Sequence, residues 1–435
     1  MWGRWWTSLS APSRPEAPPA AADLGRPALA PFRTRSFRIQ WPADLGTAWA
    51  LEMETLILGW YVLVESGSVG LLTLFGALMY GGTLLSPLLG TLGDRLGLRR
   101  VLASMRLGYA LLAAVILWLS ATGRLQPGLV LGVAFLAGLI KPTDIGLRTA
   151  LVSASVPPAH LVAAMGISRT TQDSARIGGA LAGAGFMASL GLASAYVAIT
   201  VLYLVGALLT MRSGGAATRP APAAGGPASP WRDLKDGLQH VWRTPSLRAA
   251  MLLAALVNLC AFPLSGGLMP YIARDVFGLS QQGLGWLVAS FAGGALVGSI
   301  AVSALGARLR PARTMLLTCV LWYLCLLGLA GSVSVPLAMA LFMGAGLNQS
   351  LSMVCLAIIL LRTSDQRFRG RVMGVRMLAI YTLPLGLLAA GALIPVIGFA
   401  GLVGAYGGLG LLLTAVIAWV WRQPLLDKDA PANQR

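Results

Sequence analysis

The stretch GLLTLFGALMYGGTLLSPLLGTLGDRLGLRRVL, residues 70–102, carries the two patterns that recur along this chain. Its first part is a run of about 20 mainly apolar residues, the length of helix that crosses the hydrocarbon core of a bilayer. Its second part is a short break rich in Gly and Arg, after which the chain becomes apolar again. The stretch therefore predicts a membrane-spanning helix, a tight basic loop and the start of another helix.

A second stretch, GLGWLVASFAGGALVGSIAVSALGARLRPARTML, residues 283–316, repeats this order of a Gly-rich apolar run and an Arg-rich break. Transporters are commonly built from two such structural repeats, with the substrate site at their interface. A receptor built as a single bundle, or an enzyme, does not need the repeat. We therefore expect two related halves and no enzymatic activity.

The composition agrees with a chain that lies mostly in a membrane. Of its 435 residues, 56% are hydrophobic and only 11% are charged, whereas soluble domains carry about 25% charged residues. We therefore expect an all-α integral membrane bundle of twelve helices in two pseudo-symmetric six-helix halves. The expected helices are 42–64, 69–90, 101–120, 128–150, 163–187, 191–211, 247–271, 282–304, 314–331, 335–361, 372–394 and 397–421.

The segments outside these helices set the expected domain organisation. A Pro/Ala-rich N-terminus predicts a disordered tail, and the Pro/Gly/Ala-rich stretch 212–230 predicts a flexible linker. The following stretch WRDLKDGLQHVWRTPSLR, residues 231–248, has helical spacing and predicts a surface helix. The expected units are a tail at 1–40, a six-helix half at 41–211, a linker at 212–246, a second six-helix half at 247–421 and a tail at 422–435.

The net charge of +18 comes from 33 basic and 15 acidic residues, and its position along the chain decides its meaning. Arg residues gather in alternate breaks, namely Arg95, Arg99 and Arg100, then Arg308, Arg310 and Arg313, then Arg362, Arg367, Arg369 and Arg371, while the intervening breaks hold only Arg124 or Arg274. Basic loops favour the cytoplasmic side of a membrane. We expect a multi-pass protein of a bacterial inner membrane with both termini and the linker in the cytoplasm, and no nucleic-acid partner.

The break GTLGDRLGLRR, residues 90–100, combines residues that suit a conformational latch. Its glycines permit a tight turn and a close approach of helices. Asp94 can accept hydrogen bonds at the N-terminus of a neighbouring helix, where the helix dipole favours an anion. The alternative is a positively charged anchor with a tight turn, but an Asp is unexpected in a loop selected only for positive charge.

This break is similar to the loop signature of the major facilitator superfamily at Gly90, Leu92, Asp94, Arg95, Gly97, Arg99 and Arg100. Further segments resemble the branch that contains the enterobactin exporter and the macrolide efflux pumps. These segments are FRIQW (37–41), ETLILGWYVLVESGS (54–68), SVPPAHLVAAMGISRTTQDSARIGGALAGAG (155–185) and FRGRVMG (368–374). The resemblance implies export of a small organic molecule, drug-like, siderophore-like or metabolite, by alternating access and coupled to protons.

Three departures from the family pattern bear on mechanism. The second copy of the loop has Ala307 where the Asp would stand, so we expect a latch on one side only. The fifth helix lacks the Gly-Pro pair that the antiporter signature carries, and the fourth helix has Lys141 where proton-coupled drug exporters carry an Arg. The second and third departures differ from the pattern of proton antiporters, whereas export remains the expected function.

Charged residues inside the expected helices are the sharpest candidates for function. Each costs about 2.5–3.5 kcal/mol near the bilayer centre, so such residues usually face a cavity or a partner. The candidates are Glu52 and Glu54 on the first helix, Asp144 and Arg148 with Lys141 on the fourth, and Asp173 and Arg176 with Arg169 on the fifth. The alternative is that each stripe of alternating sign forms structural ion pairs within its own helix.

Asp173 and Glu54 stand out because both lie deep in their expected helices. Asp173 is about ten residues into the fifth helix, which places it roughly 15 Å along the axis and near the midplane. Burial and a nearby cation act on a carboxylate in opposite directions, as a proton-carrying group requires. We expect Asp173 or Glu54 to carry the coupling proton or a charge that the substrate displaces, with Arg176 holding the carboxylate of Asp173 when no proton is bound.

Polar residues are sparser within the helices of the second half. A largely apolar surface with a few hydrogen-bonding groups suits bulky amphiphilic compounds. The candidates for a substrate cavity are Asn258, Asn348, Gln349, Arg376 and Tyr381. The four cysteines and two histidines have no metal-ligand spacing, so we expect no metal and no cofactor.

We thus expect a monomeric secondary transporter in a lipid bilayer, with a small-molecule substrate and protons as the coupling ion. No nucleotide-binding loop of the G-x-x-x-x-G-K-[ST] type is present, which argues against ATP as the energy source. Two alternatives stay open, an uptake carrier for a small metabolite and a non-transporting membrane protein that uses this fold for assembly or docking.

The first prediction concerns the loop at residues 90–100. Asp94→Asn is expected to cut transport severely while membrane expression stays near the wild-type level, because the change removes the charge and keeps the shape. Transport in membrane vesicles and the amount of protein in the membrane provide the measurement. A wild-type transport rate in this variant would reduce Asp94 to a residue of a turn.

Overall fold

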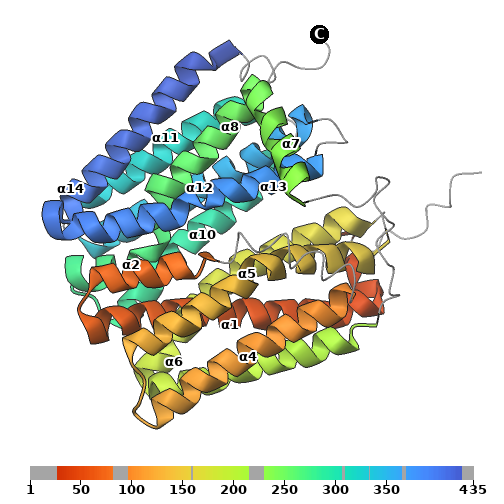
Figure 1. Ribbon diagram of the computed structural model, residues 1–435, viewed down its shortest axis with the longest axis vertical. Coiled ribbons are helices and arrows are strands. Elements are labelled where there is room, and N and C mark those ends of the chain that lie inside the picture. Colours follow the sequence, from red (N-terminus) through yellow and green to blue (C-terminus); the bar gives the residue numbers. More distant parts are fainter. Residues whose placement is uncertain are drawn as a thin grey trace, which may run out of the picture.

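A computed structural model describes residues 27–81, 97–157, 160–214, 230–305, 309–332, 334–364 and 369–423. Within these ranges every regular element is a helix, as the apolar composition predicts. Figure 1 shows two groups of long helices, one from each half of the chain. The Asp94 loop motif lies outside the described residues except for its last part, from Gly97 onward.

The first half consists of long helices that run back and forth across the bundle. After a short 3-10 helix, η1 (Pro27–Arg33), it contains α1 (Arg35–Ser66), α2 (Val69–Leu78), α4 (Leu98–Ala121), α5 (Pro127–Ser155) and α6 (Leu161–Arg212). Proline at the first turn of α5 suits its start, because the N–H that proline lacks would have no partner there. α1 begins seven residues before the expected start at 42, so residues 35–40, which we assigned to the tail, are helical.

The second half follows a linker helix and repeats this plan. The elements are α7 (Pro230–Arg243), α8 (Pro245–Leu256), η4 (Val257–Ala261), η5 (Pro263–Gly267), α9 (Met269–Tyr271), η6 (Ile272–Val276), α10 (Gln281–Leu305), α11 (Pro311–Ala330), α12 (Val335–Thr363), α13 (Arg369–Ile380) and α14 (Thr382–Val420). α7 occupies the segment where a surface helix is expected. The span from α8 to η6 contains three π-helical stretches around Pro263 and Pro270, where proline removes backbone donors.

Two glycines at matching places make the relation between the halves visible. Gly191 interrupts α6 at φ 80°, ψ 175°, and Gly398 interrupts α14 at φ 69°, ψ 177°. Each break separates the last two spans of its half. Nine helices among the described residues are long and apolar enough to span a membrane, and two of these contain the breaks. With α2, they account for the twelve expected crossings and confirm the fold class.

Glycines also decide how closely α1 approaches the first part of α6. A Cβ at Gly179 would lie 2.8 Å from Glu52 Cβ, and one at Gly183 would lie 3.1 Å from Met53 Cα. Because no side chain intervenes, the two backbones pack against each other, as small residues allow in membranes. This packing fixes which side of α1 faces α6 and therefore where the charges of α1 point.

The two halves meet most closely at one end of the bundle. We call the end that carries α7 the linker end, and the opposite end, where α1 and α13–α14 reach Ser66 and Gly398, the far end. In Figure 1 the ribbons of the halves approach each other around α2 and α10 and diverge toward α7. The contacts at the far end are Gly59 with Pro270, Thr73 with Gly391, and the Arg274 guanidinium donating to the Leu63 carbonyl at 2.9 Å.

The second prediction concerns the two interrupting glycines. Gly191→Ala and Gly398→Ala are each expected to destabilise the protein by about 1–3 kcal/mol, because this backbone region is accessible essentially only to glycine. No neighbouring atom lies within 4 Å of a Cβ at either position, so the strain is purely conformational. Unfolding of the purified protein in mixed micelles provides the measurement.

Gly185→Ala is the matched control, because Gly185 is helical and a Cβ there meets nothing within 4 Å. Alanine favours a helix over glycine by up to about 1 kcal/mol, so this variant should be as stable as the wild type or more so. Equal stability of Gly185→Ala and Gly191→Ala would contradict the strained junction.

Candidate functional site

Glu54 lies on α1 and points into the interior of the first half. Its side chain is buried, and the Tyr203 hydroxyl of α6 donates a hydrogen bond to its Oε2 at 2.7 Å. The Tyr109 ring of α4 stacks on Tyr203 with centroids 5.3 Å apart, and Tyr196 lies close by on α6. Lys141 of α5 is near enough to interact electrostatically, but no ion pair to Glu54 forms within the described part of the chain.

Glu52 points in a different direction, as its spacing of two residues from Glu54 requires. Its Oε1 lies 3.6 Å from Arg176 Nε, across the close contact of α1 with the first part of α6. The two side chains are 36% and 38% exposed although both lie well inside their helices. Charged side chains at such depth face the bundle interior or a water-filled space rather than lipid. The pair therefore marks the side of the first half that water reaches.

Asp173 connects the two halves. Its carboxylate Oδ2 lies 3.2 Å from Arg169 Nε on the same helix and accepts a hydrogen bond from Ser299 of α10 at 3.0 Å. Ser299 in turn lies within 2.9 Å of the Ser350 hydroxyl of α12. Asp173 is 2% exposed, so these contacts are shielded from water.

Asp173 does not form the ion pair with Arg176 that we expected. Asp173 forms its ion pair with Arg169, one turn before it, and Arg176 forms its ion pair with Glu52 of α1. Arg176 still interacts electrostatically with Asp173. The helical spacing allowed either Arg, and the nearby carboxylate of Glu52 explains why Arg176 turns toward α1.

The charged residues Lys141, Asp144 and Arg148 of α5 also interact with residues of other helices. Lys141 lies over the ring of Tyr80 at 5.6 Å. Asp144 and Arg148 are both buried, and both interact electrostatically with Asp44 of α1. The alternative of ion pairing confined to one helix therefore does not describe this stripe.

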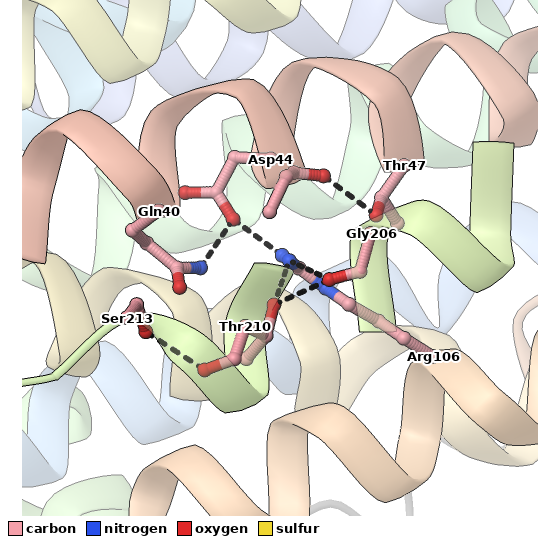
Figure 2. A network of polar contacts seen from close by, with 8 residues as sticks. Gln40, Asp44, Thr47, Arg106, Gly206, Thr210 and Ser213 are labelled. Carbon is pink, nitrogen blue, oxygen red and sulfur yellow. Dashed lines mark hydrogen bonds and ion pairs between the residues drawn. The ribbon is translucent and has the colours of Figure 1, made fainter. Parts of the chain in front are cut away.

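Asp44 belongs to a network that the sequence reasoning missed (Figure 2). Arg106 of α4 is completely buried and forms an ion pair with Asp44, and it also donates to the Thr210 hydroxyl and to the Gly206 carbonyl of α6. The Gln40 amide donates to Asp44 Oδ1 at 2.7 Å. The network thereby joins α1, α4 and the second part of α6.

A signal for this network exists in the sequence. Gln40, Asp44, Thr47 and Glu54 follow at spacings of four, three and seven residues, which places them on one face of a helix. With an expected start at residue 42, Asp44 lies near the membrane surface and attracts no attention. With the actual start at Arg35, it lies about 13 Å inside the helix.

The cavity candidates of the second half are distributed over several helices. The side-chain amides of Asn258 and Asn348 each donate to the backbone carbonyl four residues earlier, of Ala254 and Gly344, at 2.8 Å. Gln349 is buried on α12, and Tyr381 is half-buried next to the start of α14. Arg376 of α13 interacts electrostatically with Arg169 of the first half. Arg376 is thereby related to the charges around Asp173.

The described part of the loop motif agrees with a tight turn. Gly97 precedes α4 with φ +91°, a conformation that favours glycine. Arg99 and Arg100 lie in the first turn of α4. Gly90, Asp94 and Arg95 lie outside the described residues, so the latch stays a prediction.

The sequence profile of the Major Facilitator Superfamily matches residues 41–282 and 251–435. The two matches together cover nearly all of the chain, and they overlap at the start of the second half. The chain belongs to the Major Facilitator Superfamily. As a member of this family, it is a transporter rather than an enzyme.

Known proteins similar to this facilitator agree with the assignment. The multidrug efflux pump Tap of Mycobacterium tuberculosis is 31% identical over 201 residues, which cover 44% of this chain and 45% of Tap. The human organic anion transporter MFSD10 has a similar fold, with a TM-score of 0.65 at 18% identity over 88% of this chain and 99% of that one. A bacterial homologue of the lysosomal transporter Spinster gives 0.65 at 14% identity over 92% and 99%.

The third prediction tests the contact between Asp173 and Ser299 in this facilitator. Asp173→Asn and Ser299→Ala should each destabilise the protein, and their effects should be non-additive by about 1 kcal/mol or more, because hydrogen bonds to charged groups contribute about 1.5–3 kcal/mol. Unfolding free energies of the two single variants and the double variant provide the measurement.

Ser290→Ala is the control on the same helix, since the described hydrogen bond of the Ser290 hydroxyl goes to the Trp286 carbonyl of α10 itself, at 2.8 Å. It should combine additively with Asp173→Asn. Additive effects of Asp173→Asn and Ser299→Ala would show that the two residues contribute independently.

Proposed function

We propose that this facilitator exports small amphiphilic organic molecules in exchange for protons, by alternating access, with Glu54 as the proton-carrying group. The observation that carries the proposal is the environment of Glu54. It is a buried carboxylate of α1 whose described hydrogen bond comes from a neutral tyrosine hydroxyl. Binding a proton relieves the cost of burying its charge.

Three other carboxylates of the first half each form an ion pair with an arginine. Asp44 is paired with Arg106, Asp173 with Arg169, and Glu52 with Arg176. A nearby cation stabilises the ionised form of a carboxylate and so reduces the need for a proton. Comparison of the four sites therefore favours Glu54 over Asp173 as the group that binds and releases the coupling proton.

Asp173 takes a different role in this mechanism. Its bond to Ser299 crosses from the first half to the second, so a relative movement of the halves at this point must break it. We assign to Asp173 and Ser299 a contact that stabilises one conformation of the cycle. The far-end contacts between the halves support the idea that this conformation is closed at the far end.

Energetics and composition are compatible with this exchange. One proton that moves down a potential of about 100 mV supplies roughly 2.3 kcal/mol, enough for an approximately fifty-fold substrate gradient. The curated relative is a multidrug efflux pump, although the aligned stretch covers less than half of it. That name and the apolar helices of the second half support amphiphilic compounds as the substrate class.

The orientation in the membrane follows the distribution of Arg. The linker end carries α7 and the Arg-rich segments at Arg99, Arg310 and Arg371, whereas Arg124 and Arg274 lie at the far end. We place the linker end in the cytoplasm of a bacterium, on the basis of the positive-inside rule. Proton uptake at the far side and release at the linker end would then drive export.

The fourth prediction tests the coupling group. Glu54→Gln is expected to flatten the pH dependence of ethidium transport in everted membrane vesicles, because glutamine keeps the shape but cannot exchange the proton. Ethidium exchange without a pH gradient should survive. Asp173→Asn should lower the transport rate and keep the wild-type pH profile.

Glu65→Gln is the matched control, since Glu65 is exposed near the end of the same helix. It should leave both the rate and the pH profile unchanged. A wild-type profile in Glu54→Gln together with a flat profile in Asp173→Asn would move the coupling to Asp173. Wild-type profiles in both variants would make all these buried charges structural.

A further inference from the structure

Inside the first half, several buried polar side-chain atoms have no hydrogen-bond partner among the described residues. Such atoms occur in both halves, and six of the seven described on α1, α4, α5 and α6, all but Trp49 Nε1, belong to residues that interact with Asp44 or Glu54 or with their neighbours. They are Gln40 Oε1, Arg106 Nε, Asp144 Oδ1, Arg148 Nε, and the hydroxyl oxygens of Tyr109 and Tyr196. Buried polar groups in proteins nearly always have a hydrogen-bond partner, and where no protein group provides it, buried water does.

These groups follow the long axis of the bundle. On α1, Gln40, Asp44 and Glu54 share one face, and Asp44 and Glu54 are ten residues apart, or about 15 Å along the helix. On α6, residues 196, 203 and 210 repeat at spacings of seven and face the same side. The polar groups therefore form a line from the linker end to Glu54.

Electrostatic contacts connect the successive parts of this line. Asp44 interacts with Arg106 of α4 and with Asp144 and Arg148 of α5. These four residues are two acids and two arginines, so their formal charges balance.

Tyr109 connects this neutral group to the carboxylate beyond it. It interacts with Asp144 on one side and with Glu54 on the other, and its ring stacks on Tyr203. Besides Tyr109, three further groups among the described residues interact with Glu54: Lys141 of α5, and Tyr196 and Tyr203 of α6.

We infer that the interior of the first half, between α1, α4, α5 and α6, is a hydrated proton path that connects the linker end to Glu54. This inference rests on the proposed role of Glu54. A proton passes along the path when one O–H bond forms on a water or on the Tyr109 hydroxyl as another breaks. At Glu54 the proton leaves the carboxyl oxygen and the carboxylate remains, and the proton passes to waters that Asp44 and Gln40 hold by hydrogen bonds and that lead to the linker end.

The path lies apart from the space between the halves. Glu52 and Arg176, which are partly exposed, lie where α1 meets the first part of α6, whereas Glu54 contacts Tyr203 on the second part of α6. Proton and substrate therefore reach opposite sides of α1. The separation lets a proton leave Glu54 while a bulky molecule occupies the space between the halves.

The fifth prediction compares two tyrosines that are alike in burial. Tyr109 and Tyr323 are both buried, and each hydroxyl lacks a hydrogen-bond partner, but Tyr323 belongs to the second half. After a pH jump on purified wild-type protein, time-resolved infrared spectroscopy should show a protonated-carboxyl band that is lost in Glu54→Gln. Tyr109→Phe should slow the change in this band by about tenfold or more, since a positioned proton-transfer group contributes roughly 10²- to 10⁴-fold and water replaces part of it.

Tyr323→Phe should leave the rate at the wild-type value, and the melting temperatures of both variants should match within error. Gln40→Leu, at the start of the path, should slow the change as Tyr109→Phe does. Equal rates in Tyr109→Phe, Gln40→Leu and Tyr323→Phe would overturn the path and leave the role of Glu54 intact. A band that persists in Glu54→Gln would instead contradict the proposed function itself.

Discussion

A carboxylate inside the hydrocarbon core must be paired with a cation, stabilised by hydrogen bonds or protonated. The structure of the first half of this chain depends on that constraint. Asp44 and Arg106 neutralise each other within one bundle of three helices. Glu52 and Arg176 do so across a helix contact that water reaches. Glu54 is held by a tyrosine hydroxyl instead. These differences are the basis for the separate roles that we propose for chemically similar carboxyl groups.

Glycine packing determines these environments because it fixes the rotation of α1. Gly179 and Gly183 bring α6 against the side of α1 that carries Glu52 and Met53, so the side that carries Glu54 must turn toward Tyr203. The same reasoning applies between the halves, where Gly391 allows α14 to approach Thr73 of α2. A substitution at such a glycine would therefore alter charge placement as well as packing.

The twelve crossings could be predicted from the sequence because the length and apolar character of each run are dictated by the bilayer. The different directions of the Glu52 and Glu54 side chains could also be predicted, because residues two apart on a helix do not share a face. The network of Asp44 and Arg106 could not be placed, because its depth depends on where α1 begins, and that start is fixed by tertiary packing of Phe37 against Val152 and Ala164. The ion-pair partner of Asp173 could not be predicted either, since helical spacing allowed both Arg169 and Arg176. The neighbouring helix α1 decides between them, because its Glu52 pairs with Arg176.

The central claim is that Glu54 releases its proton when substrate binds, and a measurement of proton release on binding tests it most directly. Ethidium is added to purified protein in weakly buffered detergent solution, and a pH indicator follows the protons that appear. The wild-type protein should release protons in proportion to bound ethidium, and Glu54→Gln should bind ethidium without releasing any. Undiminished release from Glu54→Gln, or ethidium binding to the wild type without release, would contradict the claim.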